Sequence, residues 1–315
     1  MDAIQERDWA ELPVDAILYI LRKLDLVELV QGGVAEVCSS WRRAARDEAV
    51  LWRHIDIRGR FPGDLDHLAR GAVRISTGQC ENFCGQYMDD DFLLFLADRA
   101  PLLRCLRLKF CHGITSEGFA AAITNFPLLE ELELDLCRGI DDTGGVFEHV
   151  ARSCPRMKHI TYLKHPGFNF RITDLDNDRE ALAIASMPEL RTLQLFRDNL
   201  TNTGLTSIID NCPHLEFLDL RSCRNISMDD ALQAKCSRIK KSTLLPDFKD
   251  QRDHFDTDSE ISSCSLSYSD IVVDTSYEYI VGDDSVPNEF LGEDDEINLE
   301  HYDRILDKTM RRYKM

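Results

Sequence analysis

Eleven cysteines and nine histidines are the side chains of this 315-residue chain that could bind a metal ion or attack a substrate. A structural zinc site takes its cysteines and histidines in closely spaced pairs, but no CxxC pair with a matching downstream pair occurs here. Cys80 and Cys84 are the two nearest cysteines, and the histidines do not cluster. No glycine-rich phosphate loop and no nucleophile–base pair stands out. The sequence therefore predicts no catalytic residue, no metal site and no cofactor.

The odd number of cysteines also argues against a disulfide framework, so we expect buried thiols in a reducing compartment. The N-terminal residues MDAIQERDW lack the basic and apolar segments of a secretory signal. No apolar run approaches the roughly 20 residues that span a bilayer. We therefore expect the chain in the cytoplasm, the nucleus or both, without a membrane partner.

The net charge of −19 argues against nucleic acid as a main partner, because a bulk phosphate-binding surface is basic. The acidity is uneven: residues 246–315 hold 19 acidic and 7 basic side chains, a net of −12, which leaves −7 for the first 245 residues. Residues 243–315 are expected to form an acidic, mostly disordered tail with a possible short helix at 298–313.

The elements that would hold the cysteines follow from an internal repeat in residues 101–236. A phrase of three spaced leucines and a cysteine recurs after a proline, as in Leu103, Leu106, Leu108 and Cys111, in Leu129, Leu132, Leu134 and Cys137, and in Leu215, Leu218, Leu220 and Cys223. One further copy carries Asp198 in the cysteine position, and a degenerate copy begins at Met157. Such a period indicates leucine-rich repeats, each with one strand and one helix.

The second half of each unit shows a helical pattern, with apolar residues at i, i+3, i+4 and i+7 before each proline. A single strand–helix pair cannot bury its apolar face, whereas stacked units share one core. We therefore predict an α/β fold: a short solenoid of about six units over residues 65–242, with parallel strands on the concave face and helices on the convex face. The segment from Met88 to Phe92 is expected to begin a helix of an irregular first unit.

Residues 7–58 contain three short helical patterns. Leu12-Pro13 begins the first, in which four aliphatic side chains share one stripe: Ile17, Ile20, Leu21 and Leu24. Residues 26–30 form the second, and Gly32-Gly33 ends it. The third begins at Val34, and Val37, Cys38 and Trp41 continue it at the same spacing. A module this small has a marginal core, so we expect a partner or a neighbouring domain to complete it.

This order of elements, with Val37-Cys38-Ser39-Ser40-Trp41-Arg42 and then Leu51-Trp52, resembles the F-box. The cysteine-containing repeats are similar to those of plant F-box proteins of the Skp-interacting type. The resemblance implies a three-helix F-box that docks on a Skp-type adaptor, which sits on a cullin. It implies that the following residues form or support the adaptor-binding surface: Leu12, Pro13, Ile17, Leu21, Leu24, Val37, Cys38 and Trp41.

The strand positions between the leucines are expected to line the concave face, where a protein substrate would bind. They include charged residues such as Lys164, and aromatic and arginine side chains that typically anchor interfaces. Phe196 and Phe217 are expected at corresponding or nearly corresponding positions of adjacent strands. An insertion that begins at His165 adds two more phenylalanines at the rim. The expected substrate contacts are Arg107, Lys109, Phe110, Phe168, Phe170, Phe196, Phe217 and Arg221.

The resemblance implies a substrate-recognition subunit of a Skp/cullin/F-box ubiquitin ligase, which recruits a protein for ubiquitination and proteasomal degradation and performs no catalysis itself. The alternative is a leucine-rich-repeat scaffold that binds a protein partner without ubiquitination, with the helical module only as an end cap. Binding of a Skp-type adaptor separates the two hypotheses.

Overall fold

The computed structural model describes residues 9–24, 26–31, 33–58, 65–140, 145–164, 178–223 and 225–243, which all belong to a compact unit, Met1–Asp247. A second unit, Phe248–Met315, lies outside the described residues. The acidic tail and its expected helix at 298–313 therefore lie almost wholly outside them too.

Short helices make up the N-terminal module. They are η1 (Trp9–Glu11), α1 (Val14–Leu21), α2 (Leu26–Gln31), α3 (Val34–Val37), α4 (Ser39–Asp47) and η2 (Ala49–Trp52). The third helix expected from Val34 through Trp41 is thus two helices, since Cys38 is extended with φ −166° and ψ 175°. No side-chain hydrogen bond caps α4 at this point, and the Ser40 hydroxyl donates instead to the carbonyl of Ala10 at 3.4 Å.

Two tryptophans close the core of this module. Trp41 is 9% exposed, and its indole Nε1 donates a hydrogen bond to the carbonyl of Trp9 at 3.1 Å. The Trp52 indole donates to the carbonyl of Ala45 at 3.0 Å. Each buried indole N–H therefore has an acceptor, which removes the penalty of burying a polar group.

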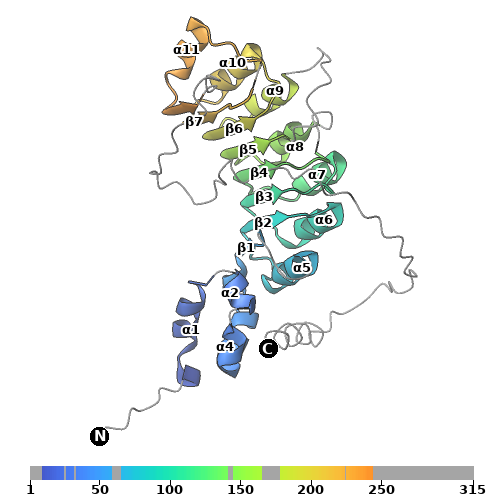
Figure 1. The fold of residues 1–315 in the computed structure, drawn as a ribbon, viewed down its shortest axis with the longest axis vertical. Helices are drawn as coiled ribbons and strands as arrows, with labels where there is room; N and C mark the ends of the chain where they lie inside the picture. The colour runs from blue at the N-terminus through green and yellow to red at the C-terminus, as the bar shows by residue number, and fades with distance from the viewer. Residues whose placement is uncertain are drawn as a thin grey trace, which may run out of the picture. The chain divides into compact units, whose positions relative to one another are not determined.

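Eight parallel strands follow in chain order and form one sheet (Figure 1). The strands are β1 (His54–Asp56), β2 (Asn82–Gln86), β3 (Cys105–Lys109), β4 (Glu131–Asp135), β5 (His159–Leu163), β6 (Thr192–Phe196), β7 (Phe217–Asp219) and β8 (Lys241–Thr243). The α/β class, with N-terminal helices before a parallel repeat sheet, is confirmed. The outermost strands β1 and β8 were not predicted, because three residues are too few to show a period.

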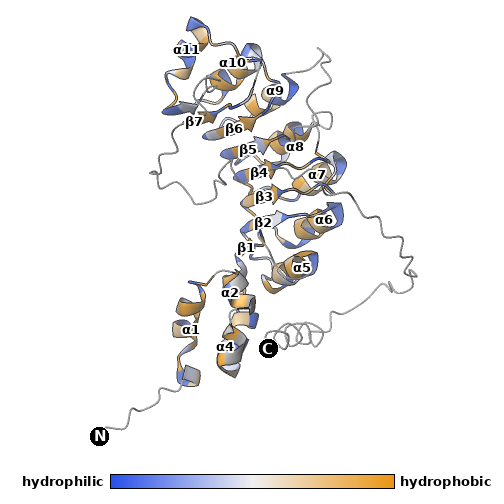
Figure 2. Cartoon of the chain, in the orientation of Figure 1, coloured by the Kyte–Doolittle hydropathy of each residue, from blue (hydrophilic) through white to orange (hydrophobic). Residues whose placement is uncertain are grey.

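A helix returns the chain from each strand to the start of the next, as parallel pairing requires. The helices are α5 (Leu65–Ile75), α6 (Asp90–Arg99), α7 (Ser116–Ile123), α8 (Val146–Ser153), α9 (Arg179–Ala185), α10 (Asn202–Asn211) and α11 (Asp230–Cys236). Short polar residues start several of them: Asp89 accepts a hydrogen bond from the N–H of Phe92 at 2.8 Å, which confirms the expected helix start there. Strands and helices of the repeats carry both hydrophobic and hydrophilic residues (Figure 2).

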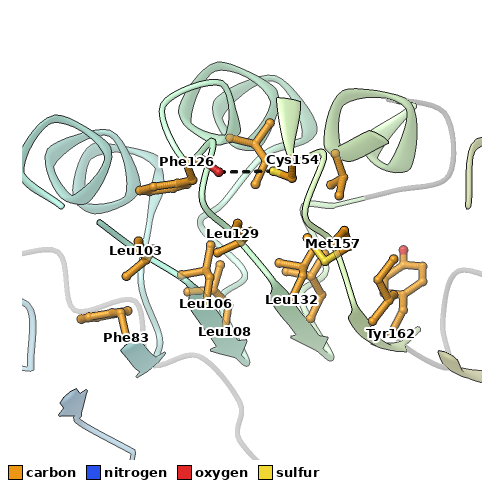
Figure 3. Packing of buried hydrophobic residues seen from close by; sticks show 14 of the residues in the cluster. Phe83, Leu103, Leu106, Leu108, Phe126, Leu129, Leu132, Cys154, Met157 and Tyr162 are labelled. Carbon is orange, nitrogen blue, oxygen red and sulfur yellow. Dashed lines mark hydrogen bonds between the residues drawn. The ribbon is translucent and has the colours of Figure 1, made fainter. Parts of the chain in front are cut away.

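The leucines of the repeat fill a continuous core between the sheet and the helices (Figure 3). Burial alternates along β4, where Leu132 and Leu134 are buried and the residues between them are half-buried. Phe119, Phe126 and Phe147 add fully buried rings from the helical layer. This alternation leaves every second strand residue on the face that the leucines do not occupy, which we call the open face.

The backbone turns at the same point after five of the strands. The residues there have left-handed conformations with φ between 53° and 66°, and they are Tyr87, Phe110, Leu136, Arg197 and Ser222. Such a conformation is costly for a residue with a Cβ atom. Its recurrence shows that the turn belongs to the repeat, where it directs the chain from the strand into the core.

Candidate functional site

The described part of the chain offers two candidate surfaces, the helical module and the open face of the sheet. Within it, no group of three or more histidine, cysteine or acidic side chains is arranged to hold a metal ion. No described helix is both long and apolar enough to cross a membrane.

Three of the eight residues expected at the adaptor surface lie in the interior of the module. Ile17 and Leu21 are fully buried, and Trp41 is nearly so. Their position suits the supporting role, because a side chain without exposed surface cannot contact a partner unless the module opens. Pro13 and Val37 are exposed. Leu12, Leu24 and Cys38 are half-buried.

The structure adds three exposed apolar side chains that sequence reasoning missed. Trp9 is 54% exposed, Val14 53% and Tyr19 68%. Together with Pro13 and Val37 they form what we call the exposed apolar set of the module. Val14 and Tyr19 lie on α1 beside the buried Ile17 stripe, but one amphipathic pattern could not show how much of the helix surface stays uncovered. Large exposed apolar groups mark interaction sites when they gather on one small module.

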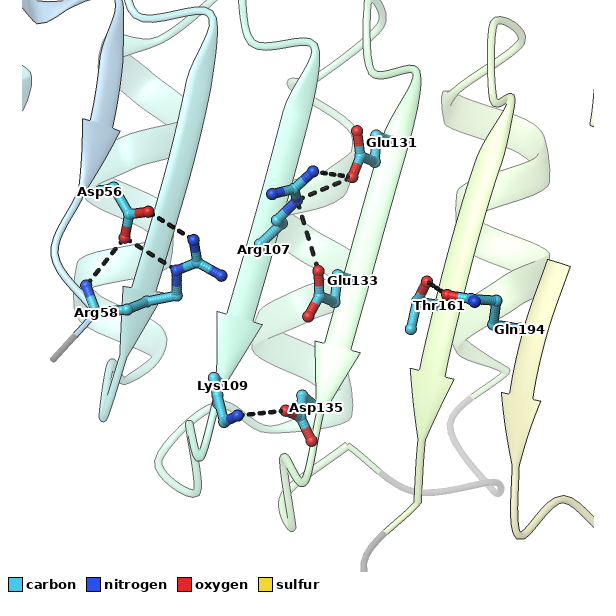
Figure 4. Close-up of polar contacts among 9 residues, drawn as sticks. All are labelled: Asp56, Arg58, Arg107, Lys109, Glu131, Glu133, Asp135, Thr161 and Gln194. Carbon is cyan, nitrogen blue, oxygen red and sulfur yellow. Dashed lines mark hydrogen bonds and ion pairs between the residues drawn. The ribbon is translucent and has the colours of Figure 1, made fainter. Parts of the chain in front are cut away.

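The open face begins with a network of ion pairs between β3 and β4 (Figure 4). Arg107 donates to the Glu131 carboxylate at 2.8 and 2.6 Å and lies 3.5 Å from Glu133. Lys109 lies 3.0 Å from Asp135. In-register parallel pairing sets Arg107 opposite Glu133 and Lys109 opposite Asp135, so opposite charges meet across the strands. The cations expected to anchor a substrate are therefore already occupied by carboxylates of this chain.

Burial shifts the pKa values of two groups on the open face. Burial raises the pKa of Glu133 above its usual range, although the nearby Arg107 acts in the opposite direction. One strand further, burial lowers the pKa of His159, and the charge of Glu131 opposes that shift.

Further along the sheet, the open face carries an uncharged pair of side chains between β5 and β6. Thr161 and Gln194 share a hydrogen bond of 2.9 Å between β5 and β6 (Figure 4). Phe196 lies at the end of β6 and Phe217 at the start of β7, where Phe217 pairs with Thr192. The expectation of corresponding positions is therefore wrong, because the two rings stand four residues apart in the strand register.

A cationic side chain lies over each of these two rings. The guanidinium carbon of Arg221 lies 5.0 Å from the Phe196 ring centroid, and the ammonium group of Lys241 lies 5.5 Å from that of Phe217. Arg221 is also held by the buried carboxylate of Asp219 at 2.9 Å. Phe110 stacks with the exposed Tyr87 at the end of β2 and β3, with centroids 6.0 Å apart. The aromatic residues expected at the substrate surface thus lie at separate points along it.

Lys164 does not lie on the open face, which corrects its expected position. It is 5% exposed and lies 2.7 Å from Asp198 and 3.0 Å from Glu180. Lys164 precedes the insertion and Glu180 lies in the first turn of α9 after it, so this buried triad holds both ends of the insertion against the core. Phe168 and Phe170, the expected anchors in that insertion, lie outside the described residues.

The cysteines connect neighbouring units. Cys154 donates to the carbonyl of Phe126 at 3.6 Å (Figure 3), and Cys223 donates to that of Leu195 at 3.3 Å. Burial raises the pKa of both thiols to about 12, which keeps them protonated and unreactive. Hydrogen bonds from neighbouring thiols lower the pKa of Cys84 and Cys111 instead. All described cysteines are free, and their contacts agree with a structural role.

Comparisons with known proteins agree with this architecture. The F-box-like family model matches residues 9–58, and a Leucine Rich repeat model matches residues 211–230. Putative F-box/LRR-repeat protein 23 of Arabidopsis thaliana is 39% identical over 78% of this chain and 54% of its own length. F-box protein SKIP19 of the same plant is 38% identical over 78% of this chain and 80% of its own length.

A third Arabidopsis relative, Putative F-box/LRR-repeat protein 22, is 40% identical over 74% of this chain and 75% of its own length. The chain therefore spans about half of the first relative and at least three quarters of the other two. Among solved structures, the complex of Rad7 and Elc1 in yeast matches with a TM-score of 0.43 and 16% identity, over 62% of this chain and 59% of that chain.

Proposed function

This chain belongs to the F-box/LRR-repeat proteins, and from that premise we propose that it is the substrate-recruiting subunit of a Skp/cullin/F-box ubiquitin ligase. In this role the helical module binds a Skp-type adaptor, and the repeats hold a protein substrate. Other subunits carry out the transfer of ubiquitin, so the chain needs no catalytic residue. One observation carries the proposal. A single compact unit contains both an F-box-type module with exposed apolar side chains and a repeat sheet with an open face.

The exposed apolar set supports adaptor binding by the module. Trp9, Val14 and Tyr19 expose more than half of their surfaces, which costs solubility unless a partner covers them. Pro13 lies directly before α1, where it needs no backbone donor and holds the start of the helix. An apolar groove on the adaptor would cover this set, with Ile17 and Leu21 keeping α1 in place from the inside.

The open face supports substrate binding by the repeats. Because Arg107 and Lys109 are paired with carboxylates of β4, a substrate gains little from them unless it replaces those partners. A substrate can contact the uncharged pair of Thr161 and Gln194 without displacing a carboxylate of β4. The same holds for the rings of Phe196 and Phe217 and the cations over them. We therefore propose that the substrate contacts lie mainly on β5–β7.

Recruitment of this kind acts through proximity. A substrate held on the sheet while the module is bound to the adaptor stays near the ubiquitin-charged enzyme, which raises the effective concentration of its lysines. We propose that this assembly forms in the cytoplasm or the nucleus. Degradation of the substrate by the proteasome would follow from its ubiquitination.

Copurification of the full chain with a Skp-type adaptor tests the proposal. We expect the wild-type chain to form a stable complex, and Leu12→Ala/Pro13→Ala to weaken it at least about tenfold, because contacts at an interface centre typically contribute more than about 1 kcal/mol each. The matched control is Leu94→Ala/Leu182→Ala, which removes two exposed leucines from repeat helices α6 and α9. Unchanged adaptor binding by the Leu12/Pro13 variant would refute the ligase role.

The rival function is a repeat scaffold whose helical module caps the array. The direct passage from η2 into β1, which pairs with β2, favours it, because the module is then continuous with the first strand of the sheet. A scaffold would capture its partner equally well with or without the adaptor, and would not promote ubiquitination of that partner. Affinity capture with the adaptor present and the proteasome blocked, followed by mass spectrometry, separates the two and identifies the substrate.

A further inference from the structure

Three arginines converge on one phenylalanine ring on the helical side of the first repeats, away from the open face. The guanidinium carbons of Arg99, Arg70 and Arg74 lie 4.4, 4.9 and 5.1 Å from the centroid of the Phe95 ring. Arg70 and Arg74 are one turn apart on α5, and Phe95 and Arg99 are one turn apart on α6. The spacing on both helices therefore directs all four side chains to a single place.

This cluster concentrates positive charge. Three groups that each lie about 5 Å from a common point are within about 10 Å of one another, roughly the Debye length in physiological salt, so their repulsion is only partly screened. Burial lowers the pKa of Arg74 below its usual range, and the charges of Arg99 and Arg70 lower it further. A chain with a net charge of −19 thus holds a local cationic site.

Two of the three arginines donate a hydrogen bond to a carboxylate, whereas Arg74 feels the charge of Asp66, which partly opposes the lowering of its pKa, without such a bond. Asp66 accepts a hydrogen bond from Arg70 at 2.7 Å, and Asp98 accepts one from Arg99 at 2.9 Å. Among the described residues, no oxygen accepts a hydrogen bond from Arg74, which is exposed. Its planar group of five N–H donors is therefore accessible to solvent beside two other cations.

Packing of α5 on α6 does not by itself account for this arrangement. A phenylalanine ring attracts cations at its two faces and repels them at its edge, so Phe95 stabilises two guanidinium groups better than three, although Arg70 also lies 5.6 Å from the centroid of the Phe92 ring. The third cation adds repulsion, which an anion would relieve. Guanidinium groups match the oxygens of phosphate with paired hydrogen bonds, and clusters of arginines are the usual means of binding phosphorylated groups.

We propose that Arg70, Arg74 and Arg99 form a binding site for a phosphate-type dianion on the α5–α6 surface. Arg74 supplies the paired hydrogen bonds, and the other two add positive charge within about 5 Å of the Phe95 ring centre. This site is separate from the exposed apolar set and from the open face, and it does not depend on the proposed ligase role. Its ligand is a phosphorylated protein side chain or a free phosphate compound, and the test below distinguishes these sources.

The test is a titration of the full chain, labelled with nitrogen-15 at arginine, and observed through the Nε–Hε signal of Arg74. Its signal is assigned by its loss in Arg74→Gln. The three probes are inorganic phosphate, a neutral glycine–serine peptide with one phosphoserine, and the same peptide without phosphate. We expect a saturable shift with both phosphate probes and none with the unphosphorylated peptide. Tighter binding of the phosphopeptide than of inorganic phosphate indicates a protein ligand, and the reverse order indicates a free phosphate compound.

Substitutions test whether the phosphate probes bind at the three arginines. Arg74→Gln is expected to lower the phosphopeptide affinity about tenfold, as loss of a charge-assisted hydrogen-bond pair implies, and Arg74→Lys to lower it less because the charge remains. The matched control is Arg152→Gln, which removes an exposed arginine from the last turn of α8. The proposal is overturned if the shift grows linearly with phosphate as it does with sodium chloride, or if Arg152→Gln weakens binding as much as Arg74→Gln.

Discussion

Replacement of Lys164 by methionine should destabilise the repeats more than loss of any exposed ion pair. The Lys164 ammonium group lies 2.7 Å from Asp198 and 3.0 Å from Glu180, and the three side chains are 5%, 4% and 10% exposed. Methionine has a similar length and fills the space of the lysine stem. The substitution therefore removes the cation and leaves two buried carboxylates side by side.

The magnitude follows from these distances. At an effective dielectric constant of about 20, each contact contributes roughly 5–6 kcal/mol of attraction, and desolvation of the three groups offsets much of it. Removal of one partner from a buried ion pair typically costs about 3–5 kcal/mol, because the remaining charge has no counterion. For a folded unit of this size that corresponds to a decrease of roughly 6–20 °C in Tm.

Thermal unfolding followed by circular dichroism measures the change. The control is Lys235→Met, which removes an exposed lysine 2.5 Å from Asp210, with side chains 38% and 51% exposed. We expect that control to change the free energy of unfolding by at most about 1 kcal/mol. The triple variant Lys164→Met/Glu180→Gln/Asp198→Cys should recover much of the loss, since no buried charge remains and the repeat regains its cysteine. Equal Tm values for Lys164→Met and Lys235→Met would refute the reasoning.

Three further outcomes are expected. Burial lowers the pKa of His159, so the unfolded chain binds more protons than the folded chain below about pH 6.5. Stability should therefore fall from pH 7 to 5, and His159→Gln should flatten that slope in urea unfolding; parallel slopes would contradict it. The Cys154 thiol, with a pKa of about 12, should react with Ellman's reagent at pH 8 only as the protein unfolds, whereas rapid native labelling would show that it is accessible. Leu132→Ala should cost about 2–5 kcal/mol of unfolding free energy and the exposed Leu94→Ala less than about 1, and similar losses would argue against the assigned burial.

The repeat was predictable because large hydrophobic side chains recur at its period. Leucines such as Leu106 and Leu132 recur at a fixed offset from a proline, and both are buried in adjacent strands as expected. Helix starts were also predictable where short polar residues precede apolar ones, as at Asp89. These signals are local, so one sequence contains them in full.

Properties that depend on the relation between distant segments were not predictable. Lys164 directly follows β5, and only the approach of Glu180 and Asp198 makes its burial favourable. The separation of Phe196 from Phe217 depends on the register of β6 and β7, which sequence spacing left open. The exposure of Trp9 and Tyr19 depends on which faces of the short helices remain uncovered.

The repeat units contact mainly the units directly before and after them, which affects how the array unfolds. Each strand pairs with the strands directly before and after it, and the principal helix contacts follow the same order, from α5 with α6 to α10 with α11. Cooperativity in such an array passes from unit to unit and weakens wherever one junction is weak. A defect at the β5–β6 junction should therefore split unfolding into two transitions, with β6–β8 melting first while β1–β4 and the helical module remain folded. Limited proteolysis would then release the carboxyl-terminal strands as a separate fragment and leave a shorter array that retains the helical module.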